Sequence, residues 1–242
     1  MSSGNFLTIG SVFYSLLLIT VFFSKKRLKT LENKIYSMLI ICNFIGLILA
    51  IMCYYTVLYN DIVPMLNFII SRLYLIYLVS YIFLFFCYLI AGLYTEDDKL
   101  TGKIKKFFIS ITFIFFVIVF LVYYLPLYYH NENMIIYSYG PSANIIYFLA
   151  TVCMTIWTIL LIKNYKKVKN KKFWPIVFFI IGSLIVTIVQ KNNPGLLLMT
   201  SFETFITIIM YFTIENPDTK MLEEVHKAKV ISDNANEEKT MF

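Results

Sequence analysis

Charged residues are scarce in this chain of 242 residues, since Asp, Glu, Lys and Arg make up 14% of it, against about 25% in an ordinary soluble domain. Glycine and proline are also few, with 8 and 6 residues. Hydrophobic residues make up 60% of the chain and occur in long continuous runs. This pattern excludes an ordinary soluble domain and indicates a chain surrounded by lipid.

Residue types that bind metals or perform catalysis are equally sparse. The two histidines, His130 and His226, are far apart in the sequence, and the topology inferred below puts them on opposite sides of the membrane. The cysteines lie inside apolar runs without metal-ligand spacing, so we expect them to pack as small hydrophobic residues; they are Cys42, Cys53, Cys87 and Cys153. There is no catalytic carboxylate pair and no glycine-rich phosphate loop. We therefore expect no catalytic, cofactor-binding or metal site in this chain.

Seven apolar runs are long enough to cross a bilayer, which takes about 20 residues of helix at a rise of about 1.5 Å each. The strands of a membrane barrel alternate apolar and polar residues, whereas these runs are apolar on all sides. We predict an all-α, polytopic membrane protein with seven transmembrane helices. The predicted helices cover residues 6–24, 35–59, 65–94, 107–125, 142–162, 173–190 and 196–212.

Basic residues are distributed very unevenly between the connections. The first, third and fifth connections and the C-terminal tail hold 19 of the 21 Lys and Arg residues. Because cytoplasmic loops are enriched in Lys and Arg, we expect the N-terminus outside and the tail in the cytoplasm. The odd number of helices agrees with termini on opposite sides. The net charge of +7 is therefore attributed to topology, and we expect no nucleic-acid partner.

Two ionisable residues lie within the predicted spans, Arg72 in the third and Glu203 in the seventh. Each costs about 2.5 to 3.5 kcal/mol in mid-membrane on insertion scales if it is unpaired. Their depths below the outer face are similar, which allows an ion pair. One interpretation is a structural pair, or a snorkelling Arg72; the other is a polar spot that lines a ligand pocket.

The chain after the seventh span contains a second informative pattern. Residues Glu215, Asn216, Pro217 and Asp218 form a predicted elbow, because proline interrupts a helix and Asp218 or Thr219 can cap a new one. In the next helix, residues spaced alternately by four and three form the seam of a coiled coil; they are Met221, Val225, Ala228, Ser232 and Ala235. The alternative is an amphipathic helix on the membrane surface. The sequence stops within this pattern, so we expect a truncated chain.

Residues 210–242, MYFTIENPDTKMLEEVHKAKVISDNANEEKTMF, resemble the junction between the membrane sensor and the dimerisation domain of bacterial sensor histidine kinases. The resemblance implies a seven-helix sensor domain over residues 1–216 and a signalling linker over residues 217–242, in a multi-pass protein of the bacterial cell membrane. It implies a homodimer through the linker helix and a response regulator as partner of a kinase domain beyond residue 242. His226 does not match the phosphoacceptor, because Lys-Ala-Lys follows it. ATP and Mg²⁺ are expected only in that kinase domain.

Two other classes of protein compete with this interpretation. A small transporter or channel would show inverted repeats, interrupted helices or several polar residues along a pathway. An intramembrane enzyme would need a cluster of catalytic groups around its buried carboxylate. The sequence favours a sensory input domain of a histidine kinase and identifies no ligand for it.

Overall fold

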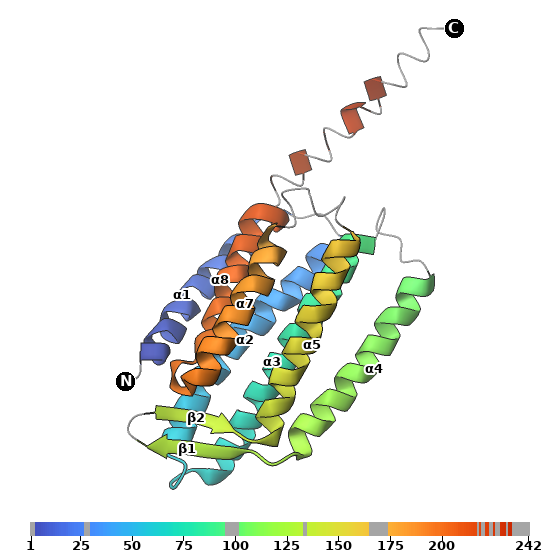
Figure 1. The fold of residues 1–242 in the computed structure, drawn as a ribbon. Coiled ribbons are helices and arrows are strands. Elements are labelled where there is room, and N and C mark those ends of the chain that lie inside the picture. The colour runs from blue at the N-terminus through green and yellow to red at the C-terminus, as the bar shows by residue number, and fades with distance from the viewer. Residues whose placement is uncertain are drawn as a thin grey trace, which may run out of the picture.

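The computed structural model describes residues 3–26, 30–94, 102–132, 135–164, 174–216, 218, 221–222, 225, 228–230 and 232–233. Within these residues, seven helices are long and apolar enough to span a membrane. They match the seven predicted runs one for one, so the predicted number of spans is confirmed. The protein therefore has the helices of a multi-pass membrane protein (Figure 1).

The helices begin and end within a few residues of the predicted runs. α2 starts earlier than its apolar run because Thr30 caps it, accepting a hydrogen bond from the backbone N–H of Asn33 at 3.2 Å. The last span is an α-helix that continues as a π-helical turn, η3. The helices are α1 Ser3–Ser24, α2 Leu31–Leu58, α3 Pro64–Tyr94, α4 Gly102–Tyr124, α5 Pro141–Lys163, α7 Trp174–Asn192, η2 Pro194–Leu196, α8 Leu198–Met210 and η3 Tyr211–Glu215.

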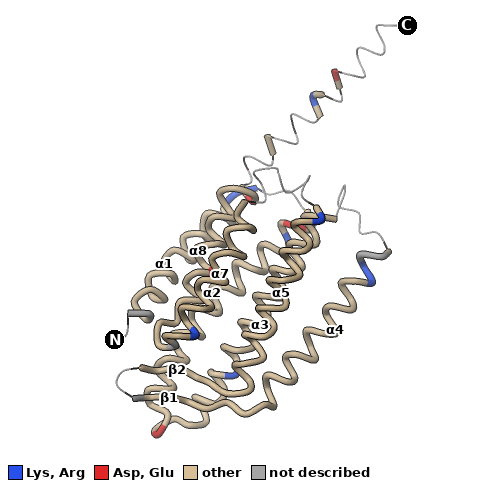
Figure 2. The backbone as a smooth tube through the Cα atoms, viewed as in Figure 1, with Lys and Arg blue, Asp and Glu red and all other residues tan. Residues whose placement is uncertain are grey.

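The first residues of α1 and the last residues of η3 lie at opposite ends of the helical bundle (Figure 1). We call the end with the first residues of α1 the hairpin end and the other the tail end. The described Lys and Arg residues gather mainly at the tail end (Figure 2), as the uneven distribution in the sequence requires. Arg72, near the start of α3, and Lys191, near the end of α7, lie toward the hairpin end.

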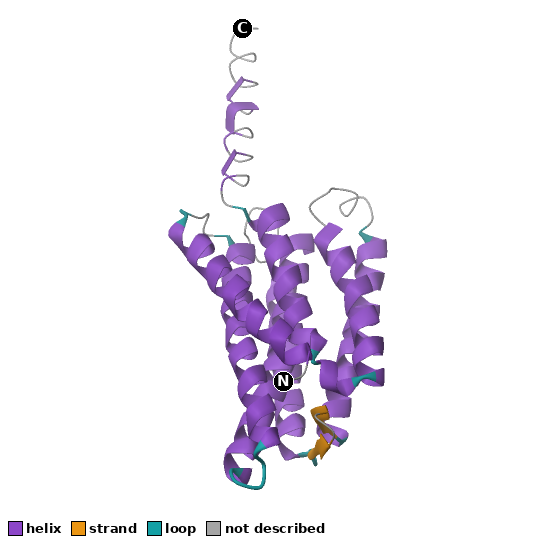
Figure 3. Ribbon diagram, turned by 90° about the vertical axis from the view of Figure 1, so that its left-hand side faces the viewer, coloured by secondary structure: helices purple, strands orange, loops and turns teal. Residues whose placement is uncertain are grey.

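The connection between α4 and α5 contains a β-hairpin, which the sequence did not predict. Strands β1 (Tyr128–Glu132) and β2 (Ile135–Tyr139) are antiparallel, with His130 opposite Tyr137. Figure 3 shows both strands at the hairpin end of the bundle. The hairpin is attached to α2 by Asn131, whose side-chain amide donates to the Leu58 carbonyl at 3.0 Å. Ile136 of β2 is buried in a cluster with residues of α2 and α3, so the hairpin covers this end of the bundle.

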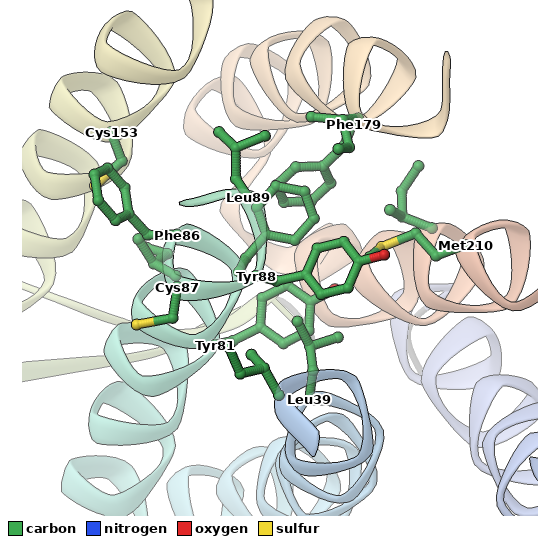
Figure 4. Packing of buried hydrophobic residues seen from close by; sticks show 14 of the residues in the cluster. Leu39, Tyr81, Phe86, Cys87, Tyr88, Leu89, Cys153, Phe179 and Met210 are labelled. Carbon is green, nitrogen blue, oxygen red and sulfur yellow. The ribbon is translucent and has the colours of Figure 1, made fainter. Parts of the chain in front are cut away.

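Large aromatic side chains fill the centre of the bundle around α3, which packs against α2, α4 and α5. Phe85 on α3 meets Phe179 on α7 with ring centroids 4.1 Å apart and Trp157 on α5 at 5.0 Å. Figure 4 shows this cluster extending to Met210 on α8. The four free cysteines pack in or against the hydrophobic clusters, as expected. Aromatic contacts therefore join α3, α5 and α7, and Met210 of α8 packs in the same cluster.

Gly46 allows α2 to lie directly against a tyrosine of α3. A Cβ atom at this position would occupy the place of the Tyr77 ring, whereas a Cβ atom at Gly10 on α1 would meet nothing within 4 Å. The absence of a side chain at Gly46 is thus a packing requirement, and the absence at Gly10 is not.

Substitution Gly46→Ala should destabilise the protein by about 1 to 3 kcal/mol, the usual cost of overpacking a well-filled interior. Gly10→Ala is the matched control, since alanine is the better helix former by about 0.5 to 1 kcal/mol and has room there. Thermal unfolding of both variants in the same detergent measures the difference. Equal midpoints would contradict the close packing of Tyr77 on α2.

Candidate functional site

A row of hydrogen bonds joins α3 to α8 along their length. The Tyr74 hydroxyl lies 3.1 Å from Thr200 Oγ1, Tyr77 donates to Glu203 Oε2, and the Tyr81 hydroxyl lies 3.1 Å from Thr207 Oγ1. Each pair is separated by 126 residues in the sequence, so two parallel helices face each other in constant register. The spacing of three and four residues puts each set on one helix face. We call these three contacts the tyrosine row.

α2 contributes a second set of polar contacts to α8. The Tyr36 hydroxyl donates to the Thr207 carbonyl at 2.6 Å, and Thr204 Oγ1 donates to Asn43 Oδ1 at 2.9 Å. All four residues are buried. In an apolar interior a polar group without a partner is costly, so these bonds hold α8 against α2.

The register between α3 and α8 changes by one residue at the π-helical turn. Tyr88 donates to Glu215 Oε1 at 2.5 Å, and this pair is separated by 127 residues. A π-helical turn contains one more residue than an α-helical turn, because its hydrogen bonds run from i to i+5. The turn at Tyr211–Glu215 therefore supplies the residue that brings Glu215 opposite Tyr88.

Glu203 is buried at the centre of the tyrosine row, with 1% of its surface exposed. Its Oε2 accepts the Tyr77 hydrogen bond, whereas its Oε1 has no hydrogen-bond partner in the described part of the chain. The backbone carbonyl of Glu203 also accepts hydrogen bonds from Tyr81 at 3.2 Å and from Thr207 at 2.7 Å. A buried carboxyl with one oxygen unused makes Glu203 the candidate functional residue of this row.

Arg72 forms no ion pair with Glu203, so the interpretation of the two residues as a structural pair does not hold. Its guanidinium donates to the Val122 carbonyl at 2.5 Å and to Ser142 Oγ at 3.1 Å, and it lies 5.3 Å from the centre of the Phe68 ring. The similar depths were a poor guide because Arg72 and Tyr77 are about 140° apart around α3, at about 100° per residue. Arg72 instead joins α3 to the end of α4 and the start of α5.

A cavity lies between the tyrosine row and the hairpin. Its walls come from α2, α3, α5, α7, α8 and β2, and it contains about 1000 Å³ of empty space, including the part that opens at the surface. Four tyrosines line it, namely Tyr54, Tyr74, Tyr137 and Tyr147. Glu203 lines it as well, and Arg72 does not. The predicted polar spot beside a pocket therefore contains only one of the two candidate residues.

Two polar contacts hold the start of the tail, one within it and one to the residue that follows α1. Asn216 Oδ1 accepts a hydrogen bond from the backbone N–H of Asp218 at 3.2 Å, so Asn216 caps the tail helix in place of Asp218 or Thr219. Asp218 forms an ion pair with Lys25, which follows α1. The hydrogen bond to Asp218 raises the pKa of Lys25 above its usual range.

The predicted elbow and seam are only partly described. Pro217 and Ala235 lie outside the described residues, as does His226. Met221, Val225, Ala228 and Ser232 are all helical and exposed. The other described residues of the tail are exposed as well, so all sides of this helix are open to contact with a partner.

The sequence contained a signal for the tyrosine row that we did not use. Tyrosines recur on α3 at positions 74, 77, 81 and 88, and Thr200, Glu203 and Thr207 recur on α8 with the same initial spacing. Two matching polar faces on apolar helices indicate that those faces meet.

Comparison of the chain with family models, curated proteins and solved structures finds no match. The function is therefore argued from the cavity, the tyrosine row and the tail.

Substitution Tyr77→Phe should destabilise the protein by about 1 to 3 kcal/mol, because it leaves both oxygens of the buried Glu203 carboxyl without a partner. Tyr54→Phe is the control, since Tyr54 is buried beside the same cavity and its hydroxyl donates no hydrogen bond in the described part of the chain. Denaturant unfolding in detergent measures both. In a Glu203→Leu background the Tyr77→Phe cost should fall, and an undiminished cost would contradict the contact.

Proposed function

We propose that this chain is the membrane input module of a sensor histidine kinase, with its hairpin end outside the cell and its tail in the cytoplasm. The observation that carries the proposal is that one helix, α8, reaches both functional regions. Near its start, Glu203 lines the cavity; beyond its end, η3 and Asn216 lead into the tail helix. A signal received in the cavity therefore has a direct mechanical route to the tail.

The π-helical turn is the element that changes state in this proposal. Conversion of a π-turn to an α-turn shifts the following chain by one residue, which is about 1.5 Å along the axis and about 100° around it. The Tyr88–Glu215 hydrogen bond favours the π state, because it requires the extra residue. A ligand that binds the two states with different affinity would shift the balance between them.

The tail transmits this rotation to a partner. Its seam residues are helical and exposed, with Val225 at 69% exposure, which suits a helix that pairs with a second copy. The resemblance of residues 210–242 to kinase junctions and the basic residues at the tail end support a cytoplasmic dimer of this kind.

The first test is phosphotransfer in membranes by the complete product of the gene, read beyond codon 242. We expect ATP-dependent labelling of a histidine and an altered level of labelling in Tyr88→Phe, which loses the hydrogen bond to Glu215. Tyr94→Phe is the matched control, because Tyr94 lies at the same end of α3 and contacts Asn164 rather than the tail. Its labelling should equal that of the wild type.

A gene that contains no kinase motifs after this chain, or a product that labels no histidine, would contradict the proposal. That outcome would favour a small transporter or channel. Equal labelling in all three proteins would remove the π-turn from the mechanism while leaving the kinase assignment intact.

The second test is disulfide crosslinking of the tail in membranes. Val225→Cys lies on the predicted seam and should give mainly crosslinked dimer on oxidation. Val230→Cys is a matched control on the other side of the helix, about 140° away, and should crosslink far less. The native cysteines lie within the transmembrane helices, so the unmodified chain gives the background. Equal crosslinking at both positions would contradict the seam.

A further inference from the structure

Glu203 gives the cavity its chemical character. Among the described residues that line the cavity, Glu203 is the only acidic residue, and there is no Lys, Arg or Asp. A site for a carboxylate or phosphate ligand would need donors such as Arg or Lys. The lining therefore disfavours anionic ligands and favours a ligand that donates hydrogen bonds or carries positive charge.

The hydrogen bonds of Glu203 leave one position for such a donor. Oε2 is occupied by Tyr77, the backbone carbonyl is occupied by Tyr81 and Thr207, and Oε1 has no partner in the described residues. Glu203 is 1% exposed, so the bundle itself keeps solvent from most of this side chain. An N–H group bound from the cavity would satisfy the remaining oxygen.

The rest of the wall fits an apolar body. Ile82, Ile146 and Ala150 contribute aliphatic surface, and tyrosine rings come from four different elements. Aromatic faces attract organic cations within about 6 Å of the ring centre.

We propose that this cavity binds a small organic amine, with its ammonium group donating to Glu203 Oε1 and its apolar body among the tyrosines. The inference rests on the proposed function, since it names the class of ligand that the input module receives. It also explains how a ligand reaches the tail. Glu203 belongs to α8, its side chain accepts the central hydrogen bond of the tyrosine row, and its carbonyl accepts hydrogen bonds from Tyr81 and Thr207, so a new bond to Glu203 acts on the helix that leads to η3.

Binding of simple amines to the 242-residue chain in phosphatidylcholine nanodiscs tests the proposal. The probes are phenethylamine and cyclohexylamine, compared with the neutral phenethyl alcohol and cyclohexanol and with the anionic phenylacetate. Empty nanodiscs give the lipid background. We expect saturable binding of at least one amine, at least about tenfold tighter than its alcohol, the usual effect of a charged hydrogen bond, and no binding of phenylacetate.

Variants locate the site. Glu203→Gln keeps the size of the side chain and should reduce amine affinity to that of the alcohol. Glu215→Gln is the matched control, because Glu215 is also buried and bonded to a tyrosine, at the other end of the span and outside the cavity. Ala150→Leu fills the cavity without changing any polar group, so it should weaken binding of every probe even if Glu203→Gln folds poorly.

Three results would overturn the proposal: amines that bind no tighter than their alcohols, amine affinity unchanged by Glu203→Gln, or no saturable binding of either amine. The outcome is separable from that of the proposed function. Amine binding that depends on Glu203 but leaves histidine labelling of the complete gene product unchanged would contradict only the proposed route from the cavity to the tail. Labelling that responds to Tyr88→Phe in a protein that binds no amine would contradict only the proposed class of ligand.

Discussion

Hydrogen bonds between α8 and its neighbours are the constraint on which this bundle depends. In lipid, apolar side chains gain little by leaving the solvent, so polar contacts and close packing must hold helices together. α8 has such contacts on two sides, from the tyrosines of α3 and from Tyr36 and Asn43 of α2. Its position therefore depends on hydroxyl groups, and the cavity, the π-turn and the start of the tail are all positioned by it.

The spans and their number could be predicted because they depend on one local property, the length of an apolar run. The charge distribution likewise follows from the sequence alone, and the described basic residues gather at one end of the bundle as predicted. The hairpin was not predictable by the same reasoning. Its strands are five residues each and stand over buried helix ends, so their pairing depends on tertiary contacts such as Asn131 with Leu58.

The candidate site was likewise predictable from the sequence only in part. Glu203 could be identified because a carboxyl in an apolar helix is conspicuous in any sequence. Its partner could not, because depth along a helix does not specify the face, and Arg72 turns toward α4 and α5 instead. The π-turn escaped prediction for a different reason. Nothing in the residues Tyr211–Glu215 breaks an α-helix, and the turn is explained by Tyr88 on another helix.

The shared offset of the tyrosine row has a consequence for how α8 can move. Because Thr200, Glu203 and Thr207 meet their tyrosines at one common offset, sliding the helix by a fraction of a turn strains every contact together. No intermediate displacement would keep some of the three contacts while breaking the others. Under the proposed function, a graded occupancy of the cavity by ligand would therefore change the fraction of molecules in each discrete position of α8, and would not move the helix by a graded distance.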